Sequence, residues 1–139
     1  MSVRYMLDTD IASYIISDRF SKLREKLREV PMSDVGVSVI TEAELRFGLA
    51  RKPDVSHLAF IIEDFLLRVE ILPWDSNAAK SYANLRADLE REGKLLGSMD
   101  MMIAAHALAA GRVLVTHDQG FRRVKKLRIE DWSRGKEFS

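Results

Sequence analysis

Short runs of apolar residues alternate along the chain with longer segments in which apolar residues recur every three or four positions. A short apolar run is typical of a buried strand, and the longer spacing is typical of a helix with one face against a core. The strand runs are residues 3–7, 35–39, 69–72 and 113–116, with a weaker one at 127–130. The helical patterns cover residues 11–17, 21–30, 42–50, 55–68, 76–92, 99–110 and 121–126. This alternation predicts an α/β fold built from βα units around a mostly parallel sheet.

Residues that favour helix ends mark several of these boundaries. Ser21 and Asp75 are candidate N-caps, because their side-chain oxygens can accept hydrogen bonds from free backbone N–H groups. Gly93 and Gly111 follow helical patterns, and glycine readily takes the left-handed conformation that ends a helix. Pro53 separates two helical patterns, and no stretch has the composition of an interdomain linker.

Composition narrows the class of protein. The chain of 139 residues is 47% hydrophobic and 31% charged, which suits a single domain over residues 1–139. It has no cysteine, so disulfides and thiolate metal sites are excluded. The three histidines, His57, His106 and His117, lack the close spacing of zinc ligands. No apolar run is long enough to span a bilayer and no signal-peptide pattern is present, so we expect a cytoplasmic protein without a membrane partner.

Basic residues are unevenly distributed, although the net charge is only +1. Residues 19–29 contain five basic and two acidic side chains, and residues 122–128 contain five basic side chains and no acid. Solvated helix faces account for such segments, and so would a surface that binds a polyanion. The second segment supplies candidate polyanion-binding residues: Arg122, Arg123, Lys125 and Lys126.

Acidic residues follow two of the predicted strands. Asp8 comes just after the first strand, and Asp118 comes just after the strand at 113–116. Ligands of an open α/β sheet bind beyond the carboxyl ends of its strands, and right-handed crossovers bring those ends to one edge. We therefore expect Asp8 and Asp118 to lie at the same edge of the sheet.

Two more acids lie in the predicted first turns of helices. Thr41 is a candidate N-cap with Glu44 three residues later, and Ser98 is a candidate N-cap followed by Asp100. Helices that follow parallel strands begin at the edge where the strands end, so Glu44 and Asp100 are expected to join the other two acids in one cleft. Glu42 lies two helix positions from Glu44 and points about 160° away, so it is expected to be secondary.

Each acid also has a purely structural explanation. The spacing of Thr41 and Glu44 matches a capping box, Asp100 suits the helix dipole, and Asp8 and Asp118 suit turns or caps.

Other residues of the same segments favour a cleft. Gly48 costs about 1 kcal/mol relative to alanine in a helix, which predicts a compensating close approach. Ala104 and Ala105 are expected to leave the helix face below Asp100 uncrowded. Clustered carboxylates repel one another unless a proton or a cation neutralises them. An all-oxygen set suits Mg²⁺ or Mn²⁺, which bind phosphate oxygens and activate water.

Five motifs, in order along almost the whole chain, resemble those of PIN-domain ribonucleases, and most closely those of the VapC toxins of bacterial toxin–antitoxin pairs. They read "YMLDTDI", "SVITEAELRFG", "GSMDMMIAAHA", "VLVTHDQGFRRV" and "LRIEDWS". The resemblance implies a PIN-like three-layer α/β/α sandwich whose parallel sheet has about five strands in the order 3-2-1-4-5. It also implies cleavage of RNA that depends on Mg²⁺ or Mn²⁺ and leaves a hydroxyl on one fragment and a phosphate on the other.

The resemblance also assigns roles to single residues. It implies four catalytic acids, of which Asp8, Asp100 and Asp118 bind metal directly and Glu44 does so directly or through water. Two hydroxyl residues, Thr9 and Thr116, are expected to support them. In "LDTD" the family usually has asparagine where this chain has Asp10, and "THD" places His117 beside the cleft with a local hydrogen bond or an RNA contact as its expected role.

Partners follow from the same resemblance. Similar toxins of enteric bacteria cut initiator tRNA in its anticodon loop, a cognate antitoxin silences the family by covering the acidic cleft, and the toxins pair as homodimers. Phe60 and Leu67 lie on one face of the helical pattern at 55–68, outside the apolar stripe that is expected to face the core: Val55, Leu58, Ala59, Ile62, Leu66 and Val69. We expect these two side chains to be exposed and to contribute to a dimer interface, although a neighbouring helix of the same chain could cover them.

Two alternatives remain open from the sequence. A phosphoacceptor receiver domain also combines a doubly wound sheet with an acid pair and a late hydroxyl, but it leaves Glu44 and Asp100 unexplained. A non-catalytic RNA- or protein-binding module on the same fold is the other, and the presence of all four acids argues against it.

Overall fold

The computed structural model describes residues 4–52, 54 and 56–134. Five short strands form one fully parallel sheet in the order β3-β2-β1-β4-β5, as the resemblance implied. The strands are β1 Tyr5–Leu7, β2 Val35–Ser38, β3 Glu70–Leu72, β4 Val113–Val115 and β5 Ile129–Glu130. A receiver domain has the order 2-1-3-4-5. The sheet order therefore excludes the receiver alternative.

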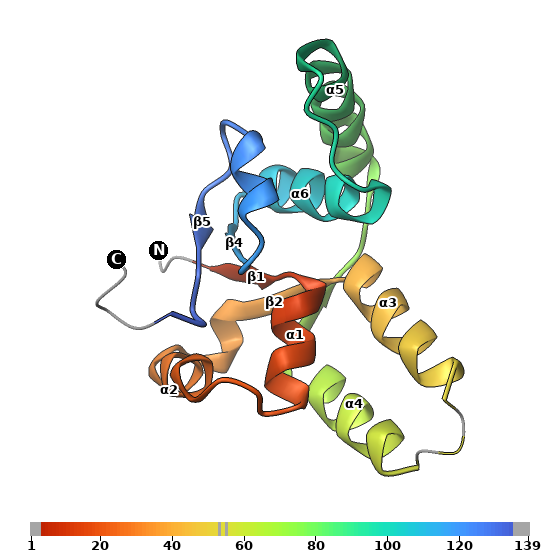
Figure 1. Ribbon diagram of the computed structural model, residues 1–139, viewed down its shortest axis with the longest axis vertical. Coiled ribbons are helices and arrows are strands. Elements are labelled where there is room, and N and C mark those ends of the chain that lie inside the picture. Colours follow the sequence, from red (N-terminus) through yellow and green to blue (C-terminus); the bar gives the residue numbers. More distant parts are fainter. Residues whose placement is uncertain (1–3, 53, 55, 135–139) are drawn as a thin grey trace.

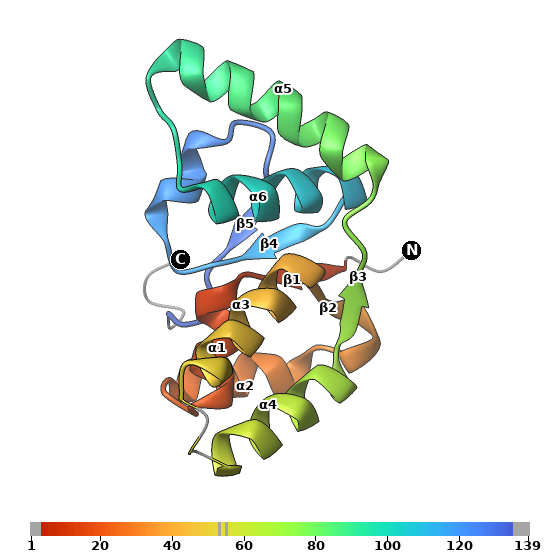
Figure 2. The ribbon, with the colours of Figure 1, turned by 90° about the vertical axis from the view of Figure 1, so that its right-hand side faces the viewer.

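Helices cover both faces of this sheet, so the molecule has three layers (Figure 1). The helices are α1 Thr9–Ile16, α2 Ser21–Glu29, α3 Val39–Ala50, α4 Ser56–Arg68, α5 Ser76–Glu92 and α6 Ser98–Ala110, with short 3-10 helices η1 Met32–Asp34 and η2 Gln119–Arg123. Figure 2 shows α5 and α6 on one side of the sheet and the first four helices on the other. The segment predicted as helical at 121–126 is a 3-10 helix that begins earlier. The predicted positions 3, 53 and 55 lie outside the described residues.

Two apolar cores lie on the two faces of the sheet, because successive strand residues point to opposite sides. In β1, Met6 packs with the core under α5 and α6, and Leu7 packs with the core under α1, α2 and α4. Both side chains are fully buried. On α4, Ile62 and Leu66 are buried as expected. Among the described residues, no helix is both long and apolar enough to cross a membrane.

Several helix ends follow the sequence signals. The Asp75 side chain accepts a hydrogen bond from the Ala78 N–H at 3.0 Å and caps α5. Gly93 and Gly111 end α5 and α6 with φ of 66°. The expectation for Ser21 is wrong, since Phe20 occupies the N-cap of α2 without a side-chain hydrogen bond. Ser21 is the first residue of that helix.

Helices α3 and α6 begin one to three residues earlier than the sequence predicted. Ser38, and not Thr41, is the N-cap of α3, and its Oγ accepts from the Ile40 N–H at 3.0 Å. Gly97, and not Ser98, occupies the N-cap of α6. Thr41 is therefore a fully buried residue inside α3, so its spacing to Glu44 is not a capping box.

The structure also contradicts two expectations about packing, one at Gly48 on α3 and one at Ala104 and Ala105 on α6. A Cβ added at Gly48 would meet no described atom within 4 Å, so no close approach explains this glycine. Ala104 and Ala105 are fully buried in the core between α6 and the sheet, so they do not line a cleft. A close approach occurs instead at Gly36, where an added Cβ would lie 2.9 Å from the Arg112 guanidinium.

A buried hydrogen bond joins Ser38, the N-cap of α3, to helix α6 on the other side of the sheet. The Ser38 hydroxyl lies 2.7 Å from Nδ1 of His106 on α6, and both side chains are buried. The Ser38 hydroxyl thus contacts both His106 and the Ile40 N–H, from which it accepts a hydrogen bond. Burial lowers the pKa of His106, which keeps this ring neutral.

We predict that Ser38→Ala lowers the free energy of unfolding by about 1–3 kcal/mol, because it removes the cap of α3 and leaves buried Nδ1 of His106 without its hydrogen-bond partner. Ser21→Ala is the matched control and should change stability by less than about 0.5 kcal/mol, since Ser21 caps nothing. Urea unfolding of both variants measures the difference. Equal losses would contradict the assigned cap.

Candidate functional site

Asp8 connects β1 to α1 at the carboxyl edge of the sheet. Its backbone N–H donates to the Val115 carbonyl at 3.0 Å, which continues the pairing of β1 with β4. Its Oδ1 accepts from the Ile11 N–H at 2.8 Å and caps α1. Its Oδ2 accepts from the Thr116 hydroxyl at 2.5 Å. The side chain is fixed at both oxygens and only 3% of the residue is exposed.

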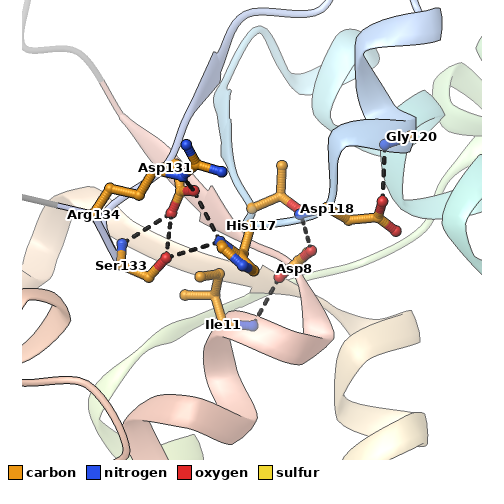
Figure 3. A network of polar contacts seen from close by, with 9 residues as sticks. Asp8, Ile11, His117, Asp118, Gly120, Asp131, Ser133 and Arg134 are labelled. Atoms are coloured by element: carbon orange, nitrogen blue, oxygen red, sulfur yellow. Dashed lines mark hydrogen bonds and ion pairs between the residues drawn. The ribbon is translucent and has the colours of Figure 1, made fainter. Parts of the chain in front are cut away.

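Thr116 directly follows β4 and links Asp8 to Asp118 through two hydrogen bonds. Figure 3 shows these two acids. Oγ1 of Thr116 accepts from the Asp118 backbone N–H at 3.0 Å while its hydrogen goes to Asp8. The exposed Asp118 carboxylate accepts from the Gly120 N–H at 2.8 Å and caps η2. A Cβ at position 120 would lie 3.1 Å from Asp118 Oδ1, so glycine leaves this carboxylate room to turn back.

Glu44 reaches the same region from α3. Thr9 donates its hydroxyl hydrogen to Glu44 Oε1 at 2.5 Å, and the Thr9 and Thr41 hydroxyl oxygens are 3.1 Å apart. Because Thr9 has one hydrogen and a carboxylate can only accept, Thr41 is the donor to Thr9. This chain of three side chains orients Glu44 toward the start of α1.

Asp100 lies in the first turn of α6 and is half-buried. Burial raises its pKa, and the negative charges of Asp118, Glu44 and Asp10 raise it further. The pKa of Asp8 is raised to about 7, first by burial and also by Asp10 and Asp100, against the lowering effect of its bonds to Thr116 and Ile11. The four acids and Asp10 therefore act on one another electrostatically, as carboxylates do when they share a site without a cation.

Two further acids near the site, Asp10 and Glu42, are not part of this set of four. Asp10 is exposed in the first turn of α1 and does not cap that helix, because Asp8 does. Glu42 accepts from Arg46 at 2.8 Å, and Arg46 also pairs with Glu63 on α4. Glu42 is thus engaged in a link between α3 and α4.

His117 makes the local hydrogen bonds expected of it. Its Nδ1 lies 2.9 Å from Asp131 Oδ2 and 3.0 Å from Ser133 Oγ. Sequence reasoning did not identify Asp131 or Ser133 as part of this region. The local pattern of an acid followed two residues later by serine indicated only a turn, and that turn forms through the Ser133 N–H bond to Asp131.

The donor set suits a hard divalent cation, since carboxylate and hydroxyl oxygens surround the edge and no described histidine or sulfur joins them. As these side chains stand, no three histidine or acidic side chains in the described part of the chain are placed so as to hold one metal ion. The carboxylates repel one another, and a bound cation would neutralise their charge. This charge is the property that makes these residues suitable ligands for a divalent metal ion.

The basic residues after β4 are all exposed. Arg123 donates to the Leu95 carbonyl at 3.0 Å, and Lys125 lies 3.6 Å from Glu92. Within residues 4–52, 54 and 56–134, Arg122 and Lys126 form no hydrogen bond or ion pair. Among the described residues, the side chains of Arg122 and Lys126 are thus unengaged, as is that of Arg128.

Comparisons with known proteins give consistent results. Residues 5–127 match the family model of the PIN domain. The chain is 37% identical over 131 residues to ribonuclease VapC2 of Haemophilus influenzae, covering 94% of this chain and 98% of that protein. It is 34% identical over 132 residues to the tRNA(fMet)-specific endonuclease VapC of Shigella flexneri, covering 94% and 99%.

Solved structures agree with the sequence comparisons. VapBC2 from Rickettsia felis, bound to a DNA fragment from the promoter, contains a chain with a TM-score of 0.88 and 30% identity, covering 94% of this chain and 99% of that chain. DNA-bound VapBC from Salmonella typhimurium gives a TM-score of 0.88 at 34% identity, with the same coverage.

The raised pKa of Asp8 predicts how the stability of the protein, measured with a chelator present, changes with pH. Between its ordinary pKa of 3.8 and about 7, the folded protein keeps a proton that the unfolded chain has released, so stability falls as pH rises through this range. Asp8→Asn keeps a capping oxygen and removes the charge. The difference in free energy of unfolding between Asp8→Asn and the parent protein should therefore shift in favour of the variant by roughly 2–3 kcal/mol from pH 5 to pH 8.

Denaturant unfolding of both proteins at the two pH values tests this. Asp10→Asn is the control. Its stability relative to the parent protein should change less with pH, because burial raises the pKa of Asp8 more than the charge of Asp10 does. A difference between parent and Asp8→Asn that does not change with pH would contradict the raised pKa.

Proposed function

The chain belongs to the PIN-domain family and, within it, to the VapC ribonucleases of toxin–antitoxin pairs, and on this premise we propose that it cleaves RNA with a divalent metal ion held by four carboxylates. One observation carries the proposal. Asp8 and Asp118 follow β1 and β4, Glu44 and Asp100 come from α3 and α6, and their charges act on one another at one edge of the sheet. A fold gains no stability from clustered like charges, so a cationic ligand is the physical reason for retaining them.

The proposed ligands are Asp8, Asp100 and Asp118, with Glu44 binding directly or through water. The metal would be Mg²⁺ or Mn²⁺, which supplies an activated water and stabilises the charge that develops on the phosphate during hydrolysis. Thr116 holds one Asp8 oxygen and the Asp118 backbone in place. Thr9 orients Glu44. These hydrogen bonds preorganise the carboxylates, so the side chains lose little freedom when the cation binds.

Arg122 and Lys126 are proposed to contact RNA phosphates, because they follow Asp118 in the sequence, are exposed and are engaged with no other described residue. Arg123 and Lys125 would join them by exchanging their present partners. The similarity to a tRNA(fMet)-specific endonuclease makes initiator tRNA the substrate to test first. The non-catalytic alternative has weaker support, because all four acids are present and act on one another electrostatically at one edge of the sheet.

We predict that Asp8→Asn and Asp100→Asn each lower the rate of RNA cleavage by at least about 100-fold, since each removes a charge that the transition state requires. Both variants should stay folded, because neutralising one of several clustered carboxylates relieves repulsion. Glu44→Gln should also lose activity. Glu42→Gln is the matched control from the same helix and should retain it, because Glu42 bonds Arg46 instead.

Gel analysis of a labelled tRNA transcript with Mn²⁺ measures these rates, and circular dichroism checks the fold. Full cleavage by Asp8→Asn would overturn the carboxylate site. Lost activity in Glu42→Gln with retained activity in Glu44→Gln would mean that the wrong glutamate was assigned.

We also propose two protein partners: a second copy of the chain and a cognate antitoxin. Phe60 is 73% exposed and Leu67 is 85% exposed, so no neighbouring described helix covers them. Phe47 on the adjacent helix α3 is 62% exposed, a residue that sequence reasoning missed. Large apolar side chains exposed on neighbouring helices favour a protein interface. The related VapBC structures contain a toxin with its antitoxin, and a basic antitoxin side chain would suit the carboxylates.

We expect a dimer at micromolar concentration in sedimentation velocity. Phe60→Glu combined with Leu67→Glu should shift it to a monomer, because the change places two charges in an apolar interface. The same double substitution should leave the thermal unfolding of the monomer nearly unchanged, since both side chains are exposed. A parent protein that sediments as a monomer, as the variant does, would refute this interface.

A further inference from the structure

His117 stands beside the carboxylates with its ring fixed in one orientation. Asp131 can only accept hydrogen bonds, so the hydrogen lies on Nδ1 of His117, which donates to Asp131 and to the Ser133 oxygen. Ser133 in turn donates its hydroxyl to Asp131 Oδ1 at 2.6 Å. Nε2 has no hydrogen-bond partner among the described residues. The side chain nevertheless remains 44% exposed.

A row of aromatic rings supports this imidazole. The Phe20 ring lies 6.4 Å from it between centroids, at an interplanar angle of 37°. Tyr14 packs edge-on against Phe20 at 5.0 Å. The Arg19 guanidinium lies 5.5 Å from the centroid of the Tyr14 ring and extends the row.

The turn after α1 positions Arg19 and Phe20 of this row and requires an unfavourable backbone conformation at Asp18. Asp18 has a φ of 54°, in the left-handed region that non-glycine residues rarely adopt. The Arg19 N–H donates back to the Tyr14 carbonyl at 3.0 Å, so α1 ends in a Schellman motif. Arg24 pairs with Asp18 and holds the turn. These contacts place Arg19 and Phe20 against the end of α1.

The row adjoins the site through the backbone of the loop after β4. His117 directly follows Thr116, which donates to Asp8, and directly precedes Asp118. Figure 3 shows the His117 ring with Asp8 on one side and Asp131 and Ser133 on the other.

We propose that the His117 ring, backed by Phe20, is a stacking site for one nucleobase next to the cleaved phosphodiester; the inference rests on the proposed cleavage of RNA. Every nucleobase has a π-face, and single-stranded RNA is commonly bound by stacking on aromatic side chains flanked by cations. Arg19 and Arg134 are exposed, and they contact Tyr14 at one end and Asp131 at the other. This combination of rings and cations suits a nucleotide better than an apolar protein segment.

The test compares two 12-nucleotide probes in EDTA, where binding is measured without cleavage. One is single-stranded oligoadenylate, and the other is a fully abasic RNA with the same sugar–phosphate chain. The parent protein should bind oligoadenylate more tightly. His117→Ala should weaken oligoadenylate binding by about 5- to 150-fold, the range of one base–aromatic stack, and leave abasic RNA binding unchanged.

Two further variants separate stacking from a structural role. His117→Phe keeps a ring and loses the bond to Asp131, so it should keep most of the preference for oligoadenylate. Phe20→Leu keeps the bulk and removes the supporting ring, so it should lose part of that preference. Thermal unfolding of each variant is recorded beside the binding data.

Three results would overturn the inference. Equal losses of His117→Ala on both probes would assign the ring to holding the segment around Asp131. A loss in His117→Phe as large as in His117→Ala would assign the effect to the hydrogen bond. If the parent protein cleaves RNA and His117→Ala binds oligoadenylate as tightly as the parent, the stacking site is refuted and the proposed function stands. If the parent protein neither binds nor cleaves RNA, the proposed function is refuted as well.

Discussion

Strand β1 pairs in parallel with β4 so that Leu7 lies opposite Val115, and this pairing fixes where Asp8 and Thr116 leave the sheet. The next residue of each strand is a member of the site, and a single hydroxyl bonds one to the other. Helix α6 then supplies Asp100 from its first turn, and α3, which begins earlier than the sequence predicted, supplies Glu44 from its second turn. Ser38 and His106 tie these two helices together in the core. Without parallel pairing, the four acids would be divided between opposite edges of the sheet.

The same arrangement costs stability. Asp8 is buried with a pKa raised to about 7, and it gains two hydrogen bonds but no cationic partner among the described residues. Arginines elsewhere neutralise acids that are structural, as Arg112 does for Glu70 across the sheet at 2.8 Å. Within the part of the chain that the structure describes, the acids of the site form no such ion pairs, which distinguishes a charge kept for a ligand from a charge kept for the fold. A bound cation would turn this repulsion into attraction.

The sequence predicted most where the determining signal is local. Helix α5 begins and ends where Asp75 and Gly93 indicated, because a capping carboxylate and a left-handed glycine act within one turn. Helix α3 begins three residues before its predicted start, because the sequence pattern assigns Val39 to the end of the strand at 35–39 and Ile40 to neither element, whereas both lie in the first turn of the helix. Tertiary packing overrides β-branched preference in that turn.

Long-range partners left no local signal. The bonds that orient Glu44 join Thr9 to residues 32 and 35 positions away, and His117 meets Asp131 across 14 positions. The sequence could identify Glu44 and His117 as candidates through the family resemblance. It could not identify the hydroxyl or carboxylate that fixes each of them, because those partners meet only after the sheet has formed.

The central claim is that these carboxylates are a divalent-metal site, and direct binding of Mn²⁺ tests it most closely. Electron paramagnetic resonance of free Mn²⁺ during titration gives the affinity without any RNA. We expect the parent protein and Glu42→Gln to bind Mn²⁺ equally, and Asp100→Asn to bind it at least about tenfold more weakly, as loss of one charged ligand requires. Equal affinity in Asp100→Asn and the parent, or no binding by the parent, would contradict the account.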